Sequence, residues 1–229
     1  MLEPPHRPFS LVVFDWDGTA VVDRREDASA LRERMLALLH HGVVLVIVTG
    51  TNLRNIAGQL ALDGLALPRG RLYAATNRGS ECYGFTPDGH PERLFLRQAS
   101  TSENQALDRI AVRLQRILEA RTGLPIAVIF DRLNRRKVDL IPVAEWADPP
   151  KARIGDLLAA VEARFQAAGL PDPLAFALET AHRLAKEEGL PEARITSDVK
   201  HIEIGLTDKS DSMRWVLDDL APALGIPTE

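Results

Sequence analysis

A short apolar run that ends in two acids and a glycine constrains the fold of this chain more than any other sequence feature. Residues 11–14 (LVVF) are apolar without interruption, and Asp15, Trp16, Asp17 and Gly18 follow them directly. Apolar runs of this length are typical of strands that are buried on both faces of a parallel sheet. The sequence therefore predicts a parallel sheet whose first strand breaks into a loop at the two acids.

The first third of the chain continues with an alternation of helices and strands. A helix that Asp27 can cap is expected to end at Gly42, because glycine commonly follows the last helical residue. The segments that follow are predicted to be a strand at 43–48, a helix at 52–62 and a strand at 71–75. Such alternation predicts right-handed crossovers and a sheet covered by helices on both faces. We therefore expect an α/β fold with a Rossmann-like parallel sheet core.

Residues 84–202 have a different pattern. The predicted elements are a long amphipathic helix at 102–121, a hairpin formed by 126–130 and 137–143, helices at 152–168 and 173–188, and strands at 194–197 and 201–204. Helices and strands without βαβ alternation indicate an α+β unit. We expect residues 84–202 to form a cap domain inserted into a core of residues 1–83 and 203–229, to which a last helix at 210–220 returns.

Composition excludes several classes of partner. The net charge is −4, with 28 basic and 32 acidic residues mixed along 229 positions. This balance argues against binding of duplex nucleic acid and favours a small-molecule substrate. No run of 18 uncharged apolar residues predicts a membrane span. Cys82 is the single cysteine, and the first eight residues lack the apolar core of a signal peptide, so a cytoplasmic location is expected.

Polar residues gather at the expected carboxyl ends of the first two strands. Asp15, Asp17 and Thr49 fall there, and ligands of open parallel sheets bind at this edge. Two acids one residue apart suit a division of labour in which one attacks and the other handles a proton. The D-x-D-G pattern also begins calcium-binding loops, but the further ligands of such a loop are missing here and valines occupy its interior.

The run Phe14-Asp15-Trp16-Asp17-Gly18-Thr19 resembles the first motif of the haloacid dehalogenase superfamily, D-x-D-G-T after a hydrophobic strand. Thr49 is similar to the second motif, and Lys209, which precedes a helix, to the third. The resemblance implies that Asp15 attacks phosphorus and becomes an aspartyl phosphate, while Asp17 protonates the leaving alcohol and then activates water. It also implies that Thr49 and Lys209 hold the phosphoryl oxygens. Mg²⁺ is the implied cofactor, bound by Asp15 and the main-chain carbonyl of Asp17.

The sequence departs from the superfamily pattern at its end. A fourth motif, an acidic pair that completes the metal site, follows the lysine by a helix and a strand, and this sequence stops at Glu229 before reaching it. We therefore expect a truncated or engineered fragment, or a protein with weak metal binding and little turnover. Asp218 and Asp219 are acidic, but a solvated helix face explains them more simply. Without the strand of that motif, the first strand is expected to be an exposed sheet edge.

The position of the insertion resembles the caps of the Cof-type and sugar-phosphatase branches, in which the cap selects the substrate. Arginines near the expected hairpin loop could bind a second anionic group or sugar hydroxyls, although an ordinary charged turn explains them more simply. The candidate substrate-binding residues are Gly50, Asn77, Arg78, Arg132, Arg135 and Arg136.

The sequence as a whole thus predicts a magnesium-dependent phosphomonoester hydrolase that acts on a small phosphorylated metabolite, with a sugar phosphate as the expected substrate. Two alternatives stay open. One is a phosphomutase with the same chemistry, and the other is a non-catalytic binding or regulatory module that retains the nucleophile without the metal site.

Overall fold

The structure is a computed structural model that describes residues 9–23, 25–147 and 149–227. The chain forms two compact units. The first comprises the described residues up to Arg97 together with those from Asp208 onward, and the second is Gln98–Thr207. The second unit is therefore an insertion in the first, which is the discontinuous arrangement that the sequence suggests.

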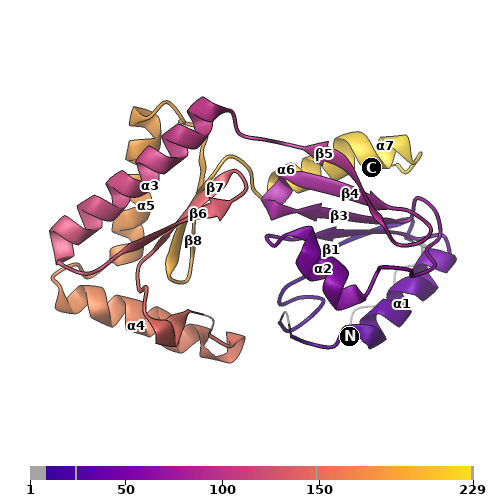
Figure 1. Ribbon diagram of the computed structural model, residues 1–229, viewed down its shortest axis with the longest axis horizontal. Coiled ribbons are helices and arrows are strands. Elements are labelled where there is room, and N and C mark those ends of the chain that lie inside the picture. Colours follow the sequence, from indigo (N-terminus) through magenta and orange to yellow (C-terminus); the bar gives the residue numbers. More distant parts are fainter. Residues whose placement is uncertain (1–8, 24, 148, 228–229) are drawn as a thin grey trace. The chain divides into compact units, whose positions relative to one another are not determined.

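The first unit is built on a five-stranded sheet in the order β1-β2-β3-β4-β5 (Figure 1). Strands β1 to β3 pair in parallel, and β4 and β5 are added antiparallel. The elements of this unit are β1 (Leu11–Asp15), α1 (Ser29–His40), β2 (Val44–Val48), α2 (Leu53–Leu60), β3 (Leu72–Thr76), the 3₁₀ turn η1 (Asn77–Gly79), β4 (Glu81–Phe85), β5 (Pro91–Leu96), α6 (Lys209–Arg214), the π-helical η4 (Trp215–Leu220) and α7 (Ala221–Ala223).

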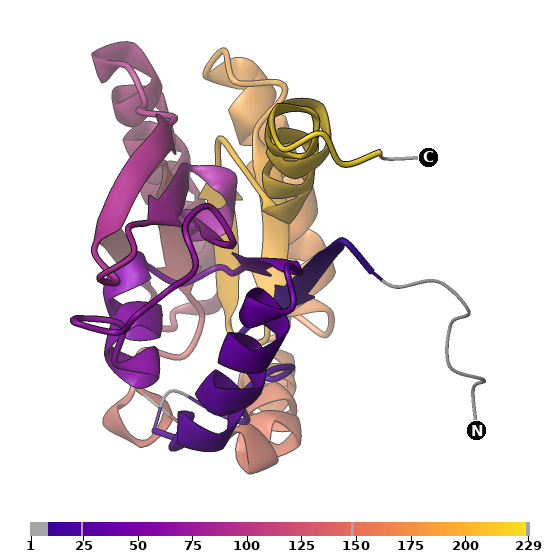
Figure 2. The same ribbon diagram turned by 90° about the vertical axis from the view of Figure 1, so that its right-hand side faces the viewer.

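Both faces of this sheet are covered, which confirms the α/β class. Side chains alternate across a strand, so Leu45 and Ile47 of β2 pack with α1 and α2, while Val44 and Val46 pack with the C-terminal helical segment. Figure 2 shows that segment and α1 on opposite sides of the sheet. All five residues of β2 are buried, whereas those of β1 at the sheet edge are half-buried. Among the described residues, β1 is thus an edge strand, as the sequence led us to expect.

The hairpin of β4 and β5 is the main element that sequence analysis did not anticipate. Its turn is closed by the amide of Thr86, which donates to the carbonyl of His90, and by the amide of Gly89, which donates to Thr86. The tip is also fastened to the loop after α2, because the amide of Gly64 donates to the carbonyl of Asp88 and the amide of Leu67 to that of Pro87. The hairpin continues the first sheet and thus belongs to the first unit.

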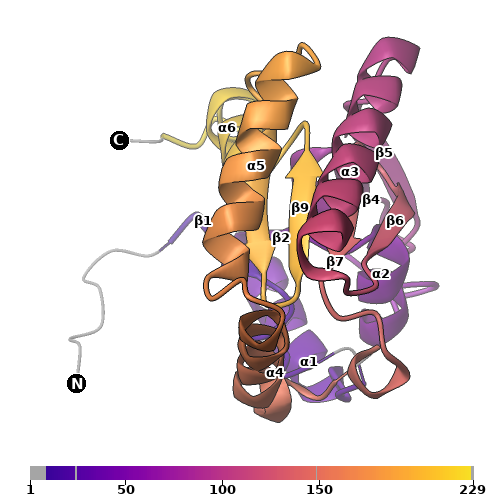
Figure 3. The same ribbon diagram turned by 90° about the vertical axis from the view of Figure 1, so that its left-hand side faces the viewer.

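The second unit is an antiparallel four-stranded sheet, in the order β6-β7-β9-β8, covered on one face by helices. Figure 3 shows α3 and α5 side by side over these strands. Its core combines residues of both layers, including Leu107, Leu114, Phe165, Ile202 and Ile204. The elements are α3 (Thr101–Thr122), β6 (Ala127–Arg132), β7 (Arg135–Asp139), the 3₁₀ turns η2 (Ala144–Trp146) and η3 (Lys151–Arg153), α4 (Ile154–Ala167), α5 (Pro173–Glu187), β8 (Arg194–Asp198) and β9 (His201–Gly205).

The boundaries between the units lie later in the chain than the sequence pattern suggests. The expected boundary before residue 84 falls inside β4, and the expected boundary after residue 202 falls inside β9. Backbone pairing explains both differences, since residues 81–84 of β4 pair with β3 and all of β9 pairs with β7. The expected hairpins of β6 with β7 and of β8 with β9 are both present.

The longest helix, α3, has well-formed ends. Ser100 accepts a hydrogen bond from the amide of Glu103, and the Glu103 carboxylate accepts from the amide of Ser100. Gly123, with φ of 67°, ends the helix in the left-handed conformation that glycine adopts without strain. Among the described residues, no helix combines the length and apolarity that crossing a bilayer requires.

Candidate active site

Asp15 and Lys209 meet at the carboxyl end of β1. The Lys209 Nζ atom lies 2.8 Å from Asp15 Oδ2, and the other carboxylate oxygen accepts a hydrogen bond of 2.9 Å from the amide of Trp16. The two side chains are 46% and 35% exposed, respectively, so this ion pair is open to a ligand. Residues that are far apart in the sequence are thus brought together, as the superfamily resemblance implies.

The loop after β1 is held in place by Trp16, the residue between the two aspartates. Its indole is completely buried, and Nε1 donates to the Gln59 side chain at 2.9 Å. The carbonyl of Trp16 accepts hydrogen bonds from the amides of Ala20 and Val21, so the chain wraps around this residue. The turn needs the positive φ of 83° at Gly18. The buried tryptophan therefore fixes the backbone that carries Asp15 and Asp17.

Thr49 and Gly50 follow β2, the strand next to Asp15. In the parallel register Asp15 pairs with Val48, so Thr49 lies one residue beyond the pair. Thr49 is fully buried, and its hydroxyl oxygen accepts a hydrogen bond of 3.2 Å from the amide of Thr51. Its hydroxyl proton can still donate, because this contact uses the oxygen only as an acceptor.

Asn77 and Arg78 lie directly against the loop after β2. Their amides donate to the carbonyls of Thr51, at 2.8 Å, and Thr49, at 3.2 Å. A Cβ atom built at Gly50 would lie 3.5 Å from the Arg78 side chain, so the arginine side chain lies over Gly50. Five of the predicted site residues of the first unit therefore converge on the ends of β1, β2 and β3: Asp15, Thr49, Gly50, Asn77 and Arg78.

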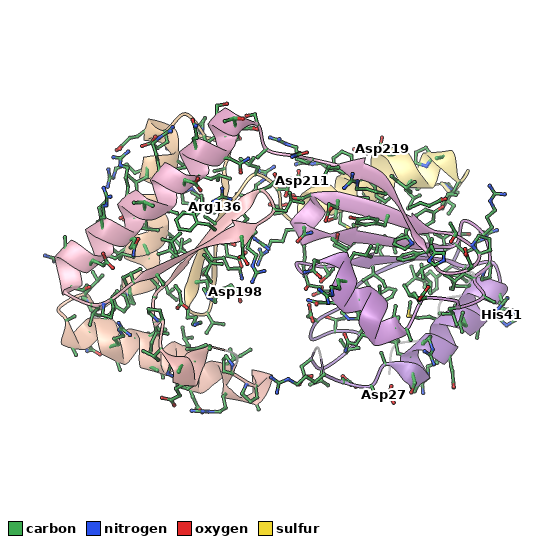
Figure 4. All side chains as sticks on the ribbon, in the orientation of Figure 1. Asp27, His41, Arg136, Asp198, Asp211 and Asp219 are labelled. Carbon is green, nitrogen blue, oxygen red and sulfur yellow. The ribbon has the colours of Figure 1, made fainter. Side chains whose placement is uncertain are left out.

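The three arginines predicted for the second unit have other surroundings. Arg135 and Arg136 are both 7% exposed, and Arg135 Nη1 lies 3.1 Å from Glu203 Oε2. Arg136 donates a hydrogen bond to the Asp108 carboxylate of α3. Figure 4 shows the Arg136 side chain near that helix. Arg132 is exposed on β6 and lies 3.7 Å from Asp131. The contacts of Arg135 and Arg136 are internal to the sheet and helix that they join.

Asp218 and Asp219 are exposed in η4, on the helical segment that begins with Lys209. Figure 4 shows Asp219 beyond Asp211, which lies in the first turn of α6. Asp211 takes part in a capping box, because its carboxylate accepts from the amide of Asp208 at 2.9 Å. The two exposed acids fit the simpler explanation of a solvated helix face.

The oxygen ligands at the end of β1 suit a magnesium ion that is bound only in part by protein. Mg²⁺ usually takes one or two carboxylates and completes its octahedron with water and phosphate oxygens. Asp15 offers a carboxylate that is partly exposed, and the main-chain carbonyl of Asp17 is a second oxygen in the same short loop. No group of three His, Cys, Asp or Glu side chains placed to hold a metal occurs in the described part of the chain.

Sequence analysis missed three residues that shape this site. Gln59 anchors Trp16, and Glu81 accepts a hydrogen bond of 2.5 Å from the Asn77 side chain. Gly79 packs against the beginning of α6. Only Gly79 carried a sequence signal, since a glycine after a strand indicates a turn or a close backbone approach.

Comparison with known proteins places this geometry in a known fold. No protein-family description matches the sequence, and no curated protein sequence matches it. Solved structures do match. An IMP-bound mutant of the Plasmodium falciparum IMP-nucleotidase has a TM-score of 0.63 at 11% identity, covering 95% of this chain and 56% of that chain. The ATP-bound form of that nucleotidase has a TM-score of 0.55 at 8% identity, covering 95% and 50%.

A structure from Eubacterium rectale has a TM-score of 0.51 at 14% identity and covers 92% of this chain and 76% of that chain. These neighbours are phosphatases of the haloacid dehalogenase superfamily. The chain has the haloacid dehalogenase fold. It spans little more than half the length of the Plasmodium structures, 56% in the first comparison. In the haloacid dehalogenase fold, an α/β core with a parallel sheet carries an inserted cap, which confirms the fold class expected from the sequence.

Proposed function

We propose that this chain is a phosphomonoester hydrolase whose nucleophile is Asp15. The observation that carries the proposal is the 2.8 Å contact between Lys209 Nζ and Asp15 Oδ2 at the end of β1. A carboxylate beside a fixed ammonium group, partly open to solvent, is suited to attack an anionic phosphate because the cation offsets the repulsion between the two anions. The haloacid dehalogenase fold supports the same reaction class.

In the first step, an oxygen of Asp15 forms a bond to phosphorus while the bond from phosphorus to the ester oxygen breaks. Asp17, two residues further on, donates its proton to that departing oxygen and becomes a carboxylate. The products are an aspartyl phosphate on Asp15 and a free alcohol. Lys209 holds the phosphoryl oxygens, and the hydroxyl of Thr49 donates a hydrogen bond to the same group.

In the second step, Asp17 accepts a proton from water, and the water oxygen bonds to phosphorus. The bond between phosphorus and the Asp15 oxygen breaks, so inorganic phosphate leaves and both acids return to their initial states. Asp15 and the main-chain carbonyl of Asp17 would hold Mg²⁺. When bound, this ion supplies positive charge that offsets the charge on the phosphoryl oxygens.

The proposed substrate is a small phosphorylated metabolite, and sugar phosphates are the first class to test. The position of the insertion in the sequence, between Thr49 and Lys209, supports this choice because it resembles that of the caps of sugar phosphatases. Two of the structural neighbours are an IMP-bound and an ATP-bound form of a nucleotidase, so nucleoside phosphates form the second class. Arg78 and Asn77, which lie beside Gly50, are the proposed contacts to the part of the substrate next to its phosphate.

The decisive experiment measures phosphate release from p-nitrophenyl phosphate with Mg²⁺. We expect Asp15→Asn to lower kcat by at least about a thousandfold, because it removes the nucleophile. We expect Asp17→Asn to lower it by about 10² to 10⁴, the usual contribution of a general acid and base. Chelation of Mg²⁺ should stop the reaction, and added Mg²⁺ should restore it.

Asp63→Asn is the matched control, since this carboxylate is exposed in the loop after α2. It should leave kcat unchanged. Equal and negligible rates for the unaltered chain and Asp15→Asn would favour a non-catalytic binding module. Transfer of phosphate between positions of a sugar without release of inorganic phosphate, followed by ³¹P NMR, would instead favour a phosphomutase.

A further inference from the structure

The turn after β3 has a backbone that side chains rarely tolerate. Three successive residues have positive φ angles: 50° at Asn77, 53° at Arg78 and 84° at Gly79. The left-handed region is costly for residues other than glycine, so such a run persists only where neighbouring groups hold it. This run lies between the loop after β2 and the helix that carries Lys209, and it contacts both.

Hydrogen bonds fasten the first part of the turn. The amides of Asn77 and Arg78 donate to the carbonyls of Thr51 and Thr49, as described above. The Asn77 Nδ2 atom donates to Glu81 Oε2 at 2.5 Å, and the Glu81 side chain is only 13% exposed. Glu81 is held in turn by the hydroxyl of Tyr83, which donates to Oε1 at 2.8 Å. The turn is therefore fixed to the end of β2 and braced from β4.

Gly79 fixes the other side of the turn against the start of α6. A Cβ atom at this residue would lie 2.5 Å from the carbonyl oxygen of Asp208 and 2.9 Å from the amide nitrogen of Ser212. Both are backbone atoms of the segment that contains Lys209, so neither can move without moving that segment. The absence of a side chain at Gly79 is what allows α6 to begin so close to the turn.

We propose that the Asn77–Gly79 turn is a positioning element that sets Lys209 against Asp15, with Gly79 as the contact and Glu81 as the brace. One rigid segment thereby fixes the loop that carries Thr49 and the helix that carries Lys209 relative to each other. The expected effect on turnover rests on the function proposed above. The expected effect on the contact between Lys209 and Asp15 does not.

The test begins with Gly79→Ala. The added methyl group should displace the start of α6, and a crystal structure should show Lys209 Nζ beyond ion-pair distance from Asp15. A misplacement of about 1 Å can cost about a hundredfold in rate, so kcat for p-nitrophenyl phosphate should fall on that order. A structure and a kcat like those of the unaltered chain would overturn the proposal.

Gly42→Ala is the matched control. Gly42 has a φ of +85°, almost the same as the +84° of Gly79, but a Cβ atom there would meet nothing within 4 Å. The two variants thus share the backbone strain and differ in the collision with α6. The control should keep the Lys209 contact and the kcat per folded molecule. Equal losses in both variants would mean that general destabilisation explains the result, which contradicts the proposal.

A double substitution separates positioning from a general structural role. If Gly79 acts through the lysine, Gly79→Ala should lower kcat no further once Lys209→Ala is present. Losses that multiply would show that Gly79 acts elsewhere. Glu81→Ala and Glu81→Gln provide a second pair if Gly79→Ala does not fold. We expect a severalfold loss for alanine and recovery for glutamine, which keeps an acceptor oxygen, whereas equal kcat values for both would count against the brace.

Failure of this inference can be told apart from failure of the proposed function. If the unaltered chain releases no phosphate, the proposed hydrolase is wrong. The distance between Lys209 Nζ and Asp15 Oδ2 in the structures of the unaltered chain, Gly79→Ala and Gly42→Ala still decides whether the turn positions the lysine.

Discussion

At the scale of single residues, the second unit contains a buried ion pair with a clear electrostatic signature. Lys200 Nζ lies 2.7 Å from Asp139 Oδ2, and both residues are under 10% exposed. Burial alone would raise the pKa of Asp139, but hydrogen bonds from His201, Lys200 and the amide of Ile141 outweigh it. They lower the pKa from an ordinary 3.8 to about 2. The charged form of Asp139 is therefore favoured by folding.

We predict that this carboxylate makes part of the stability depend on acidity. Because the folded-state pKa lies below the unfolded value, the contribution is present above about pH 4 and is lost as the pH falls through about 2. Asp139→Asn should lower the free energy of unfolding near pH 7 by on the order of 2 kcal/mol and flatten its change between these pH values. Urea unfolding at several pH values measures this.

Asp131→Asn is the control for that measurement, because this side chain is 76% exposed in the neighbouring hairpin. It should shift the unfolding curve little at any pH. If Asp139→Asn behaved in the same way as the control, the favourable contacts of Asp139 would not outweigh the cost of burying its charge.

Residues of the site could be predicted from the sequence where chemistry requires a given type at a strand end. Asp15 and Thr49 follow apolar runs, and the resemblance to a known motif adds Lys209. The partners of the buried arginines could not be predicted, because Asp108 and Glu203 come from distant elements whose packing decides the contacts. The role of Gly79 depends on a helix that lies far away in the sequence and thus has no local signal.

At the scale of elements, periodicity predicted the strands and helices whose apolar pattern is strong. The helix at 101–122 and the strands of β2 and β3 are close to the expected ranges. The β4–β5 hairpin was missed because five of the six residues of β5 are exposed and its alternation is weak. Asp88-Gly89 was the available signal, since this pair is typical of tight hairpin turns.

The capping box of α3 gives a prediction at this scale. Ser100→Ala removes the side-chain oxygen that accepts the amide of Glu103, and should destabilise the protein by about 1 kcal/mol. Ser100→Asp should retain most of the stability because aspartate also caps helices. Thr101→Ala, an exposed change one residue further on, is the control, and thermal unfolding provides the measurement. Equal midpoints for Ser100→Ala and Thr101→Ala would show that the box does not limit stability.

At the scale of the whole molecule, the second unit has what an independent domain requires. Residues 98–207 contain their own sheet and a continuous core that includes Leu107, Phe165 and Ile204. We predict that this segment, produced alone, folds cooperatively with a free energy of unfolding of about 5–15 kcal/mol. Circular dichroism during urea titration tests this, and a spectrum of a disordered chain would contradict it.

Because the first unit is discontinuous in sequence, its parts are synthesised at different times. Asp15 leaves the ribosome early, while Lys209 is synthesised only after the entire inserted segment. The nascent core therefore presents Asp15 without the neighbouring ammonium group until the inserted segment has been synthesised. Assembly of the proposed reactive centre thus waits for synthesis of the inserted segment, and a chain released before Lys209 carries the aspartate alone.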